Sequence, residues 1–257
     1  MREDTVRDDP PERRITQSLG VTFHSVEKRF GVLLALRRVS LEIAAGEFVV
    51  LLGHNGSGKT TLLRVAAMLA KPTAGRVSYS GMVAANLTRV RARIGMVAHH
   101  SLLYDELTAE ENLRFLATLY GLENPAAAAQ SSLEPAGLSS RKGDLVRTFS
   151  RGMRQRLAFA RAVLAGPALL LLDEPASGLD RDGAAWLART LRALQQEGCT
   201  ILMSSHGQNE STALATRAVA MHSGAVIADS GPSGDVRSVM EEHASSAGRA
   251  PEQVPSP

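Results

Sequence analysis

A short glycine-rich stretch in the first quarter of the chain has the residue types that hold a polyphosphate. It runs Gly53, His54, Asn55, Gly56, Ser57, Gly58, Lys59, Thr60 and Thr61. Glycines let the backbone curl closely enough for its N–H groups to converge on phosphate oxygens. Lys59 supplies a cation for the β- and γ-phosphates, and Thr60 supplies a hydroxyl for Mg²⁺. The chemistry expected here is binding of a nucleoside triphosphate with magnesium.

The segments on either side supply the context that a phosphate-binding loop needs, which is a buried strand before it and a helix after it. Residues 48–52 form a continuous apolar run that is typical of a central parallel strand. Residues 61–70 place apolar side chains on one helical face, and Pro72 ends that pattern. The alternative, a glycine-rich turn without a ligand, explains the glycines but not this arrangement.

Two adjacent carboxylates follow another apolar run. Residues 168–172 are expected to form a buried strand, and Asp173 and Glu174 come directly after it. Ligands of α/β proteins bind outside the carboxyl ends of parallel strands. Asp173 is therefore a candidate for holding Mg²⁺, and Glu174 for polarising an attacking water. A solvated turn is the alternative for these two residues, and the phosphate loop upstream disfavours it.

Other positions could approach the same nucleotide. Ser150 is placed to cap the helix that follows it, with the backbone of Gly152 in the first turn, so a second anion site is expected there. His206 follows an expected strand at residues 200–204 and could reach a γ-phosphate, although a lone histidine is more often a surface or core residue. Phe30 either packs under a β-hairpin or stacks on a nucleotide base.

The remaining periodicity predicts an α/β fold with a layer of antiparallel strands and a helical lobe. Alternation at residues 21–28 and 39–43 predicts the antiparallel layer. A capping box that begins at Thr108 opens the lobe, which covers about residues 102–165. Shorter strands are expected at residues 75–80, 94–97, 219–221 and 226–229.

The two ends of the chain are expected to lie outside the folded domain. Residues 1–18 mix charges with prolines and lack an apolar core, which predicts a disordered tail and not a signal peptide. Residues 241–257 are rich in Ala, Ser, Gly and Pro, which predicts a flexible tail. Residues 19–240 would then form one domain.

Composition limits the classes of partner. The 29 Lys and Arg residues nearly balance the 26 Asp and Glu residues, and no basic stripe with interleaved aromatic residues occurs, so nucleic acid is not an expected partner. Cys199 is the single cysteine, which permits no internal disulfide and fits a reducing compartment. The apolar stretch at residues 162–172 is too short to span a bilayer, so no membrane span is expected.

In their order along the chain, five motifs resemble those of the ATP-binding subunits of ABC transporters. They are GHNGSGKT at 53–60, FSRGM at 149–153, LLLLDEP at 169–175, SGLD at 177–180, and Ser205-His206. The resemblance covers residues of about 20 to 232. It implies a P-loop NTPase fold of the ABC-ATPase type, with a mixed central sheet, an antiparallel β-layer and an inserted helical lobe. It also favours Phe30 as the ring that stacks on adenine.

The same resemblance implies a mechanism that needs two subunits. In this family two ATP-binding subunits enclose two ATP molecules head to tail, so Ser150 and Gly152 of one chain would grip the γ-phosphate held by Lys59 of the other. A homodimer is expected.

Four further residues take expected roles from the same motifs. Glu174 would be the general base, Asp173 would position Mg²⁺, Asp180 would couple the two sites, and His206 would sense the γ-phosphate. The helical lobe would dock on an integral membrane permease. That partner would hold the chain on the cytoplasmic, inner face of the cell membrane.

Two departures from the family pattern stand out. The signature usually reads Ser-Gly-Gly-Gln, whereas Arg151 and Met153 occupy the second and fourth positions here. The glutamine that ordinarily contacts Mg²⁺ corresponds to His99, or to His100 if the loop is one residue shorter.

Details of the loop and signature look closest to haem-exporter ATPases of cytochrome c maturation, with multidrug-type exporters as the alternative. A soluble ABC ATPase is the rival class, and it is disfavoured because no long coiled-coil insert or second cassette occurs. A scaffold without turnover would be expected to lack Glu174.

Overall fold

The computed structural model describes residues 18–80, 87–98, 102–207, 209–232 and 234–247. The strands are β1 (Val21–Phe30), β2 (Leu33–Ile43), β3 (Phe48–Leu52), β4 (Ala74–Tyr79), β5 (Ile94–Val97), β6 (Leu169–Asp173), β7 (Thr200–Ser205), β8 (Arg217–His222) and β9 (Ala225–Asp229). The helices are α1 (Lys59–Ala66), α2 (Leu87–Ala92), α3 (Ala109–Leu119), α4 (Pro125–Leu133), α5 (Arg151–Val163), α6 (Arg181–Gln196) and α7 (Val236–Ala247). In this described part, no helix is long and apolar enough to cross a bilayer.

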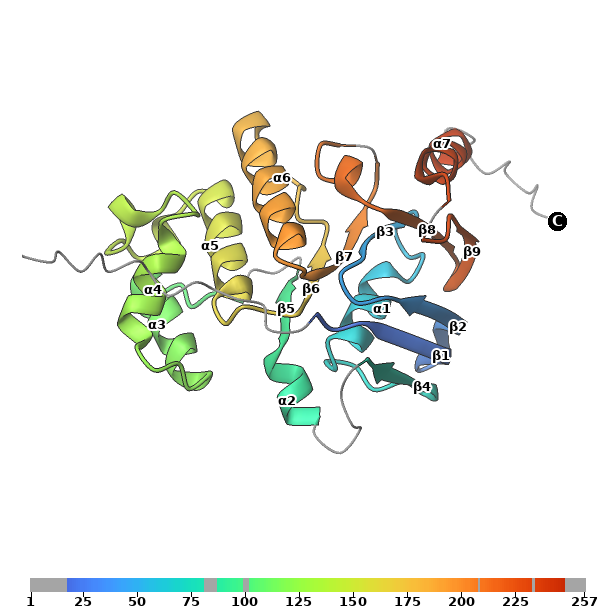
Figure 1. Ribbon diagram of the computed structural model, residues 1–257, viewed down its shortest axis with the longest axis horizontal. Coiled ribbons are helices and arrows are strands. Elements are labelled where there is room, and N and C mark those ends of the chain that lie inside the picture. The colour runs from blue at the N-terminus through green and yellow to red at the C-terminus, as the bar shows by residue number, and fades with distance from the viewer. Residues whose placement is uncertain (1–17, 81–86, 99–101, 208, 233, 248–257) are drawn as a thin grey trace, which may run out of the picture.

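A six-stranded sheet with the order β5-β6-β7-β3-β8-β9 forms the centre of the molecule (Figure 1). Its first five strands are parallel, and β9 runs antiparallel to β8 at the edge. Because β3 and β6 are separated only by β7, the segments that follow these strands meet at one end of the sheet. The predicted mixed central sheet is confirmed.

Alternate residues of the central strands enter two different cores, which explains their continuous apolar sequences. In β3, Phe48, Val50 and Leu52 pack into the core shared with α5, α6 and the helical lobe. Val49 and Leu51 point the other way, into the core shared with α1 and the antiparallel layer. A strand that is covered on both faces has no polar face to present, so its sequence does not alternate.

The antiparallel layer has the order β2-β1-β4 and lies beside α1 (Figure 1). Its inward residues include Val21, Phe23 and Leu36, which are almost fully buried. The β1–β2 hairpin turns at Gly31, so it carries Phe30 at its tip. The predicted layer is therefore present, with longer strands than the alternation alone suggested.

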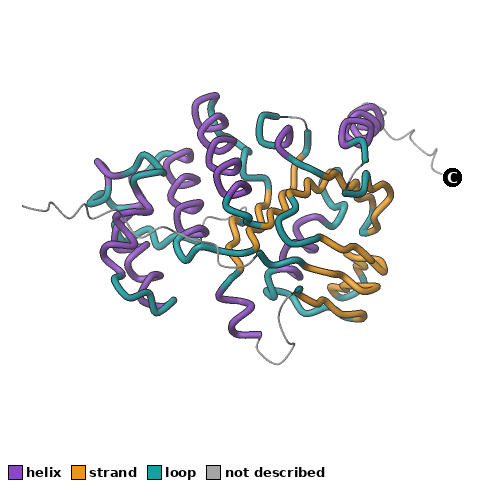
Figure 2. The backbone as a smooth tube through the Cα atoms, in the orientation of Figure 1, coloured by secondary structure: helices purple, strands orange, loops and turns teal. Residues whose placement is uncertain are grey.

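The helical lobe contains α3 and α4 and the start of α5, and lies at the opposite end of the molecule from the antiparallel strands (Figure 2). The predicted capping box is confirmed: the Thr108 hydroxyl accepts from the backbone N–H of Glu111, and the Glu111 carboxylate accepts from the backbone N–H of Thr108. These two bonds fix the point at which α3 begins.

Two helices lie where the sequence analysis predicted no helix. Helix α7 continues through Ala247, beyond residue 241, because Val239 and Met240 are buried against the core beside β8. Helix α2 lies just before β5, where no helix was predicted, and the buried side chain of Val90 anchors it. In both cases a few apolar contacts with the rest of the fold outweigh a local composition that is poor in helix signals.

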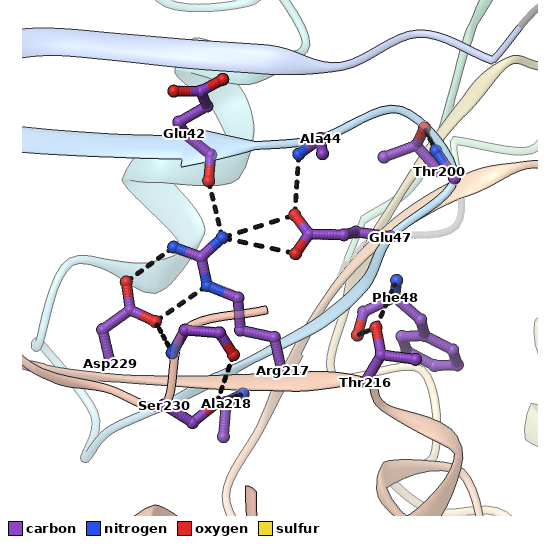
Figure 3. Close-up of polar contacts among 12 residues, drawn as sticks. Glu42, Ala44, Glu47, Phe48, Thr200, Thr216, Arg217, Ala218, Asp229 and Ser230 are labelled. Carbon is purple, nitrogen blue, oxygen red and sulfur yellow. Dashed lines mark hydrogen bonds and ion pairs between the residues drawn. The ribbon is translucent and has the colours of Figure 1, made fainter. Parts of the chain in front are cut away.

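A buried arginine, Arg217, joins the two sheets (Figure 3). Arg217 of β8 donates to both carboxylate oxygens of Asp229, at 2.8 and 2.7 Å. It also donates to the carbonyl of Glu42 at 2.8 Å and lies 3.4 Å from the Glu47 carboxylate. The hydrogen bond from Arg217 lowers the pKa of Asp229, and the same bond raises the pKa of Arg217. This network connects β2, β3, β8 and β9.

Candidate nucleotide-binding site

The glycine-rich segment between β3 and α1 folds into a tight loop whose shape depends on two glycines. Gly53 has φ 154°, and a Cβ there would lie 2.4 Å from the hydroxyl of Ser57. Gly58 has φ 104°, and a Cβ there would lie 2.8 Å from the carbonyl oxygen of Ala35. Neither position has room for a side chain, and neither backbone conformation suits one. These glycines curl the loop against the hairpin.

A cavity of about 410 Å³ opens between this loop and the hairpin. Its lining residues are Phe30, Leu33, Leu34, Ala35, Arg37, Asn55, Gly56, Ser57, Gly58, Lys59, Thr60, Thr61, Glu174 and Ser223. The volume lies within the range of about 300–1,000 Å³ that is usual for small-molecule sites. The cavity is apolar at the hairpin and polar at the loop, which suits a flat ring at one end and an anionic group at the other.

Lys59 lies at the polar end of the cavity. Its side chain is nearly buried, and its ammonium donates to the carbonyl oxygens of Gly53 at 2.5 Å and His54 at 3.1 Å. Burial lowers the pKa of Lys59, while Glu174 and Asp173 act in the opposite direction. The two carbonyl oxygens of the loop therefore hold the ammonium in place without a ligand.

A chain of hydrogen bonds links the loop to the two carboxylates. The hydroxyl of Thr60 donates to Asp173 Oδ1 at 3.0 Å, and the hydroxyl of Ser204 donates to the same oxygen at 2.9 Å. The backbone N–H of Glu174 in turn donates to Ser204 Oγ at 2.9 Å. The ends of β6 and β7 and the start of α1 are therefore joined through one carboxylate oxygen.

Ser204 was not predicted as a site residue, although it is fully buried and touches both acidic positions. The available signal was a pair of serines, Ser204 and Ser205, at the carboxyl end of an otherwise apolar strand. Because that strand lies beside β6, a polar residue there faces the carboxylates.

Glu174 lines the cavity, and its carboxylate contacts the predicted histidine. Its Oε1 lies 2.5 Å from Nε2 of His206, and its backbone has φ 53°, which is unusual for a residue with a side chain. The histidine is more exposed than the carboxylate, at 44% against 21% of the side chain. The two residues follow neighbouring strands, so the sheet brings them together.

Phe30 lies half-exposed at the mouth of the cavity, with 50% of its surface accessible. The ammonium of Lys28 lies 4.9 Å from the ring centroid and donates to the carbonyl of Lys71 at 2.8 Å. A ring that packed under the hairpin would be buried, so this placement leaves Phe30 available for stacking. A cation above one ring face also helps to fix the ring.

The other predicted site residues lie outside this cavity. Ser150 caps α5 by accepting from the N–H of Met153 at 3.3 Å, and Gly152 in the first turn has open space around its Cα. Asp180 caps α6 by accepting from the N–H of Gly183 at 2.8 Å. The expected helix cap at Ser150 is therefore present. His99 and His100 fall outside the described residues.

The site holds oxygen ligands for a cation, but too few to bind one alone. Within the described ranges, no cluster of three or more His, Cys, Asp or Glu side chains is arranged around a metal. Thr60 and Asp173 offer one hydroxyl and one carboxylate side by side. Mg²⁺ in nucleotide sites is usually held by one or two carboxylates together with phosphate oxygens. The residues present fit that arrangement.

Comparison with known proteins identifies the same family that the sequence motifs resemble. Residues 36–177 match the family described as ABC transporter. The chain is 38% identical over 215 residues to the ABC transporter ATP-binding protein NatA of Bacillus subtilis (strain 168), covering 80% of this chain and 87% of that protein. It is also 38% identical over 212 residues to the daunorubicin resistance ATP-binding protein DrrA3 of Streptomyces coeruleorubidus, covering 81% and 67% of the two chains.

The fold is similar to that of a solved structure with a bound nucleotide. That structure is the dimeric post-hydrolysis state of the ATP-binding cassette MJ0796, bound to ADP and Pi. The TM-score is 0.74 at 29% sequence identity, and the match covers 81% of this chain and 97% of the other.

Proposed function

Since this chain belongs to the ABC transporter family and is an ATP-binding ATPase, we propose that it powers a separate membrane-spanning subunit by hydrolysing ATP. The observation that carries this proposal is the hydrogen bond between Thr60, at the start of the helix after the phosphate loop, and Asp173, at the end of β6. It joins a phosphate-binding element to a carboxylate, as phosphoryl transfer with a metal requires.

In this proposal the cavity takes ATP with the base at the hairpin and the phosphates at the loop. Phe30 stacks on the base, while Lys59 and the N–H groups of the loop hold the phosphates. The lining of the cavity supports this orientation, because Gly56, Ser57 and Gly58 of the loop lie beside Lys59 at its polar end, and Phe30 lies at the hairpin end.

Glu174 serves as the general base in the proposed reaction. The oxygen of a water forms a bond to the γ-phosphorus while the bond from that phosphorus to the bridging oxygen of ADP breaks, and the water's proton passes to the Glu174 carboxylate. His206 holds that carboxylate through the contact at Oε1. Thr60 and Asp173 would hold Mg²⁺, which neutralises charge on the phosphates when it is bound.

A second copy of the chain completes the proposed site. Ser150 and Gly152 lie at the N-terminus of α5, outside the cavity of their own chain, so they are free to face a nucleotide bound to a partner. Asp180 lies at the start of α6, where it would couple the two sites. The dimeric state of MJ0796 supports this arrangement by similarity.

The helical lobe is proposed to dock on the membrane-spanning subunit. Its surface exposes Leu102, Tyr104, Phe115 and Leu119, with 44% to 66% of each residue accessible. The rings of Tyr104 and Phe115 meet edge to face, with their centroids 5.5 Å apart, so these two residues form one continuous apolar surface. This partner would place the chain at the inner face of the cell membrane.

For the cargo, the similarity to DrrA3, which is named for daunorubicin resistance, favours the multidrug-type exporter. Haem export for cytochrome c maturation stays a prediction from the loop and signature residues, and neither NatA nor DrrA3 bears a name that supports it.

The membrane partner is tested by capturing the full chain from detergent-solubilised membranes and identifying the captured proteins by mass spectrometry. We expect a protein with several membrane spans, and we expect Phe115→Ser to lose it. Leu87→Ser is the control, because Leu87 is also an exposed apolar residue but lies on α2, outside the lobe. Capture of soluble partners alone would contradict the transporter assignment and favour the soluble ABC ATPase class.

A further inference from the structure

The first turn of α5 holds the loop that follows Glu174. Arg151 Nη2 lies 3.4 Å from both the carbonyl oxygen and the hydroxyl of Ser177. One turn further along the helix, Gln155 donates to the carbonyl of Pro175 at 3.1 Å. Residues four apart lie on one helix face, so Arg151 and Gln155 hold the loop from the same side.

Gly178 is shaped to receive the arginine. Its backbone has φ 75°, and a Cβ there would lie 2.5 Å from Arg151 Cζ and 2.6 Å from Nε. The planar guanidinium therefore rests directly on the glycine, in space that any larger residue would fill. The signature that this stretch resembles usually has glycine where Arg151 stands, and a glycine could make none of these contacts.

The loop held by Arg151 connects two residues of the proposed mechanism. The N–H of Ser177 donates to the carbonyl of Glu174 at 3.0 Å, so the loop closes back on Glu174. Its other end reaches Asp180, the cap of α6. Ser150 directly precedes Arg151 in the sequence. The side chain of Arg151 therefore connects the signature, residues 149–153, to the segment that carries Glu174.

We propose that Arg151 is a positioning residue, which fixes the loop against α5 and so sets the position of the Glu174 carboxylate relative to Ser150 of the same chain. This inference rests on the proposed function, because that relative position matters only if Glu174 and Ser150 act at two nucleotide sites of one dimer. Arg151 and Ser177 are exposed, so their contact adds little to stability. Its effect is on the rate of the reaction.

Three variants of the full chain test this role: Arg151→Met, Arg151→Lys and Gly178→Ala. We expect Arg151→Met to lower kcat about tenfold, because a small displacement of a catalytic group reduces the rate. The KM for ATP and the unfolding temperature should stay close to those of the wild type, since Arg151 does not line the cavity. Arg151→Lys should recover part of the rate, because it keeps the charge but loses the planar fork.

A double-mutant cycle tests whether the contact between Arg151 and Gly178, and not each residue separately, determines kcat. Gly178→Ala should lower kcat although Arg151 is intact, and combining it with Arg151→Met should add little further loss. Arg192→Met, on an exposed position of α6, is the control and should match the wild type. Additive losses, a change confined to KM, or a wild-type kcat for Arg151→Met would overturn the inference.

Hydrogen exchange distinguishes failure of this inference from failure of the proposed function. The backbone amides of residues 174–180 should exchange faster in Arg151→Met than in the wild type, and this measurement needs no turnover. Unchanged exchange would overturn the positioning role even if the protein hydrolyses ATP. If the amides exchange faster in Arg151→Met but the wild-type chain hydrolyses no ATP, Arg151 does hold the loop, and the proposed ATP-driven transport is wrong.

Discussion

Nε2 of His206 lies 2.5 Å from Oε1 of Glu174, although the two residues are far apart in the sequence. The contact exists because β6 and β7 are paired in register, so that the segments leaving their carboxyl ends emerge side by side. The histidine lies farther out than the carboxylate, which itself lines the cavity. This order suggests that His206 acts on the carboxylate from the solvent side.

His206→Ala is expected to lower kcat by about ten- to a hundredfold, with a smaller effect on ATP affinity. Without the imidazole, the carboxylate of Glu174 keeps its chemistry but loses the group that orients it. Steady-state phosphate release over a range of ATP concentrations separates the two parameters. A rise in KM with kcat unchanged would contradict the expected role.

Lys59→Ala is expected to abolish detectable ATP binding. The buried ammonium is the one cation that this loop brings to the polar end of the cavity, and the variant leaves the phosphates without it. Isothermal titration measures the affinity, and circular dichroism checks that the variant is folded. Affinity close to that of the wild type would show that the phosphates bind elsewhere.

Ser204→Ala is expected to lower the free energy of unfolding by about 1–3 kcal/mol, because it leaves the buried N–H of Glu174 without its acceptor. It also removes one of the two hydroxyl donors to Asp173 Oδ1, so that the hydroxyl of Thr60 is left. We also expect the variant to need more Mg²⁺ for half-maximal hydrolysis, since Asp173 is less firmly held. Ser205→Ala is the control, because among the described residues its hydroxyl bonds only with the backbone of Gly207.

Asp229→Asn is expected to reduce stability at neutral pH and to flatten its dependence on acid. The hydrogen bond from Arg217 lowers the pKa of Asp229 from its ordinary value of 3.8. A carboxylate with a lowered pKa in the folded state stabilises the fold above the unfolded pKa, and this stabilisation is lost as the pH falls through the folded value. Thermal unfolding between about pH 3 and 7 should show an acid limb below pH 4 that the variant partly lacks. If the unfolding temperatures of the wild type and the variant fall in parallel with pH, the loss of stability in acid is due to other carboxylates.

Much of the fold could be predicted because its strands are local apolar runs with clear ends. The strand at Ile94–Val97 has the predicted bounds, and the helix at Pro125–Leu133 lies within the predicted helical lobe. The first is a short buried run, and the second starts at a proline and is capped by Asn124. Such signals lie within a few residues of the element that they define.

The features that the sequence did not predict depend on contacts between distant segments. Ser204 becomes a site residue only because β7 lies beside β6, and Arg217 becomes a link between sheets only because Asp229 and Glu47 converge on it. The helix α7 forms because Met240 finds a buried position. None of these pairings has a local sequence signature, since each is set by the topology of the sheet.

The central claim is that the chain hydrolyses ATP in a dimer with Glu174 as the base, and Glu174→Gln tests it most directly. The amide keeps the shape of the side chain but cannot accept the proton of the attacking water, so turnover should fall by about a hundredfold or more while ATP still binds. Size-exclusion chromatography of the variant with ATP and Mg²⁺ should then show a stable dimer. Hydrolysis by the variant at the wild-type rate, or a variant that stays monomeric with ATP bound, would contradict the account.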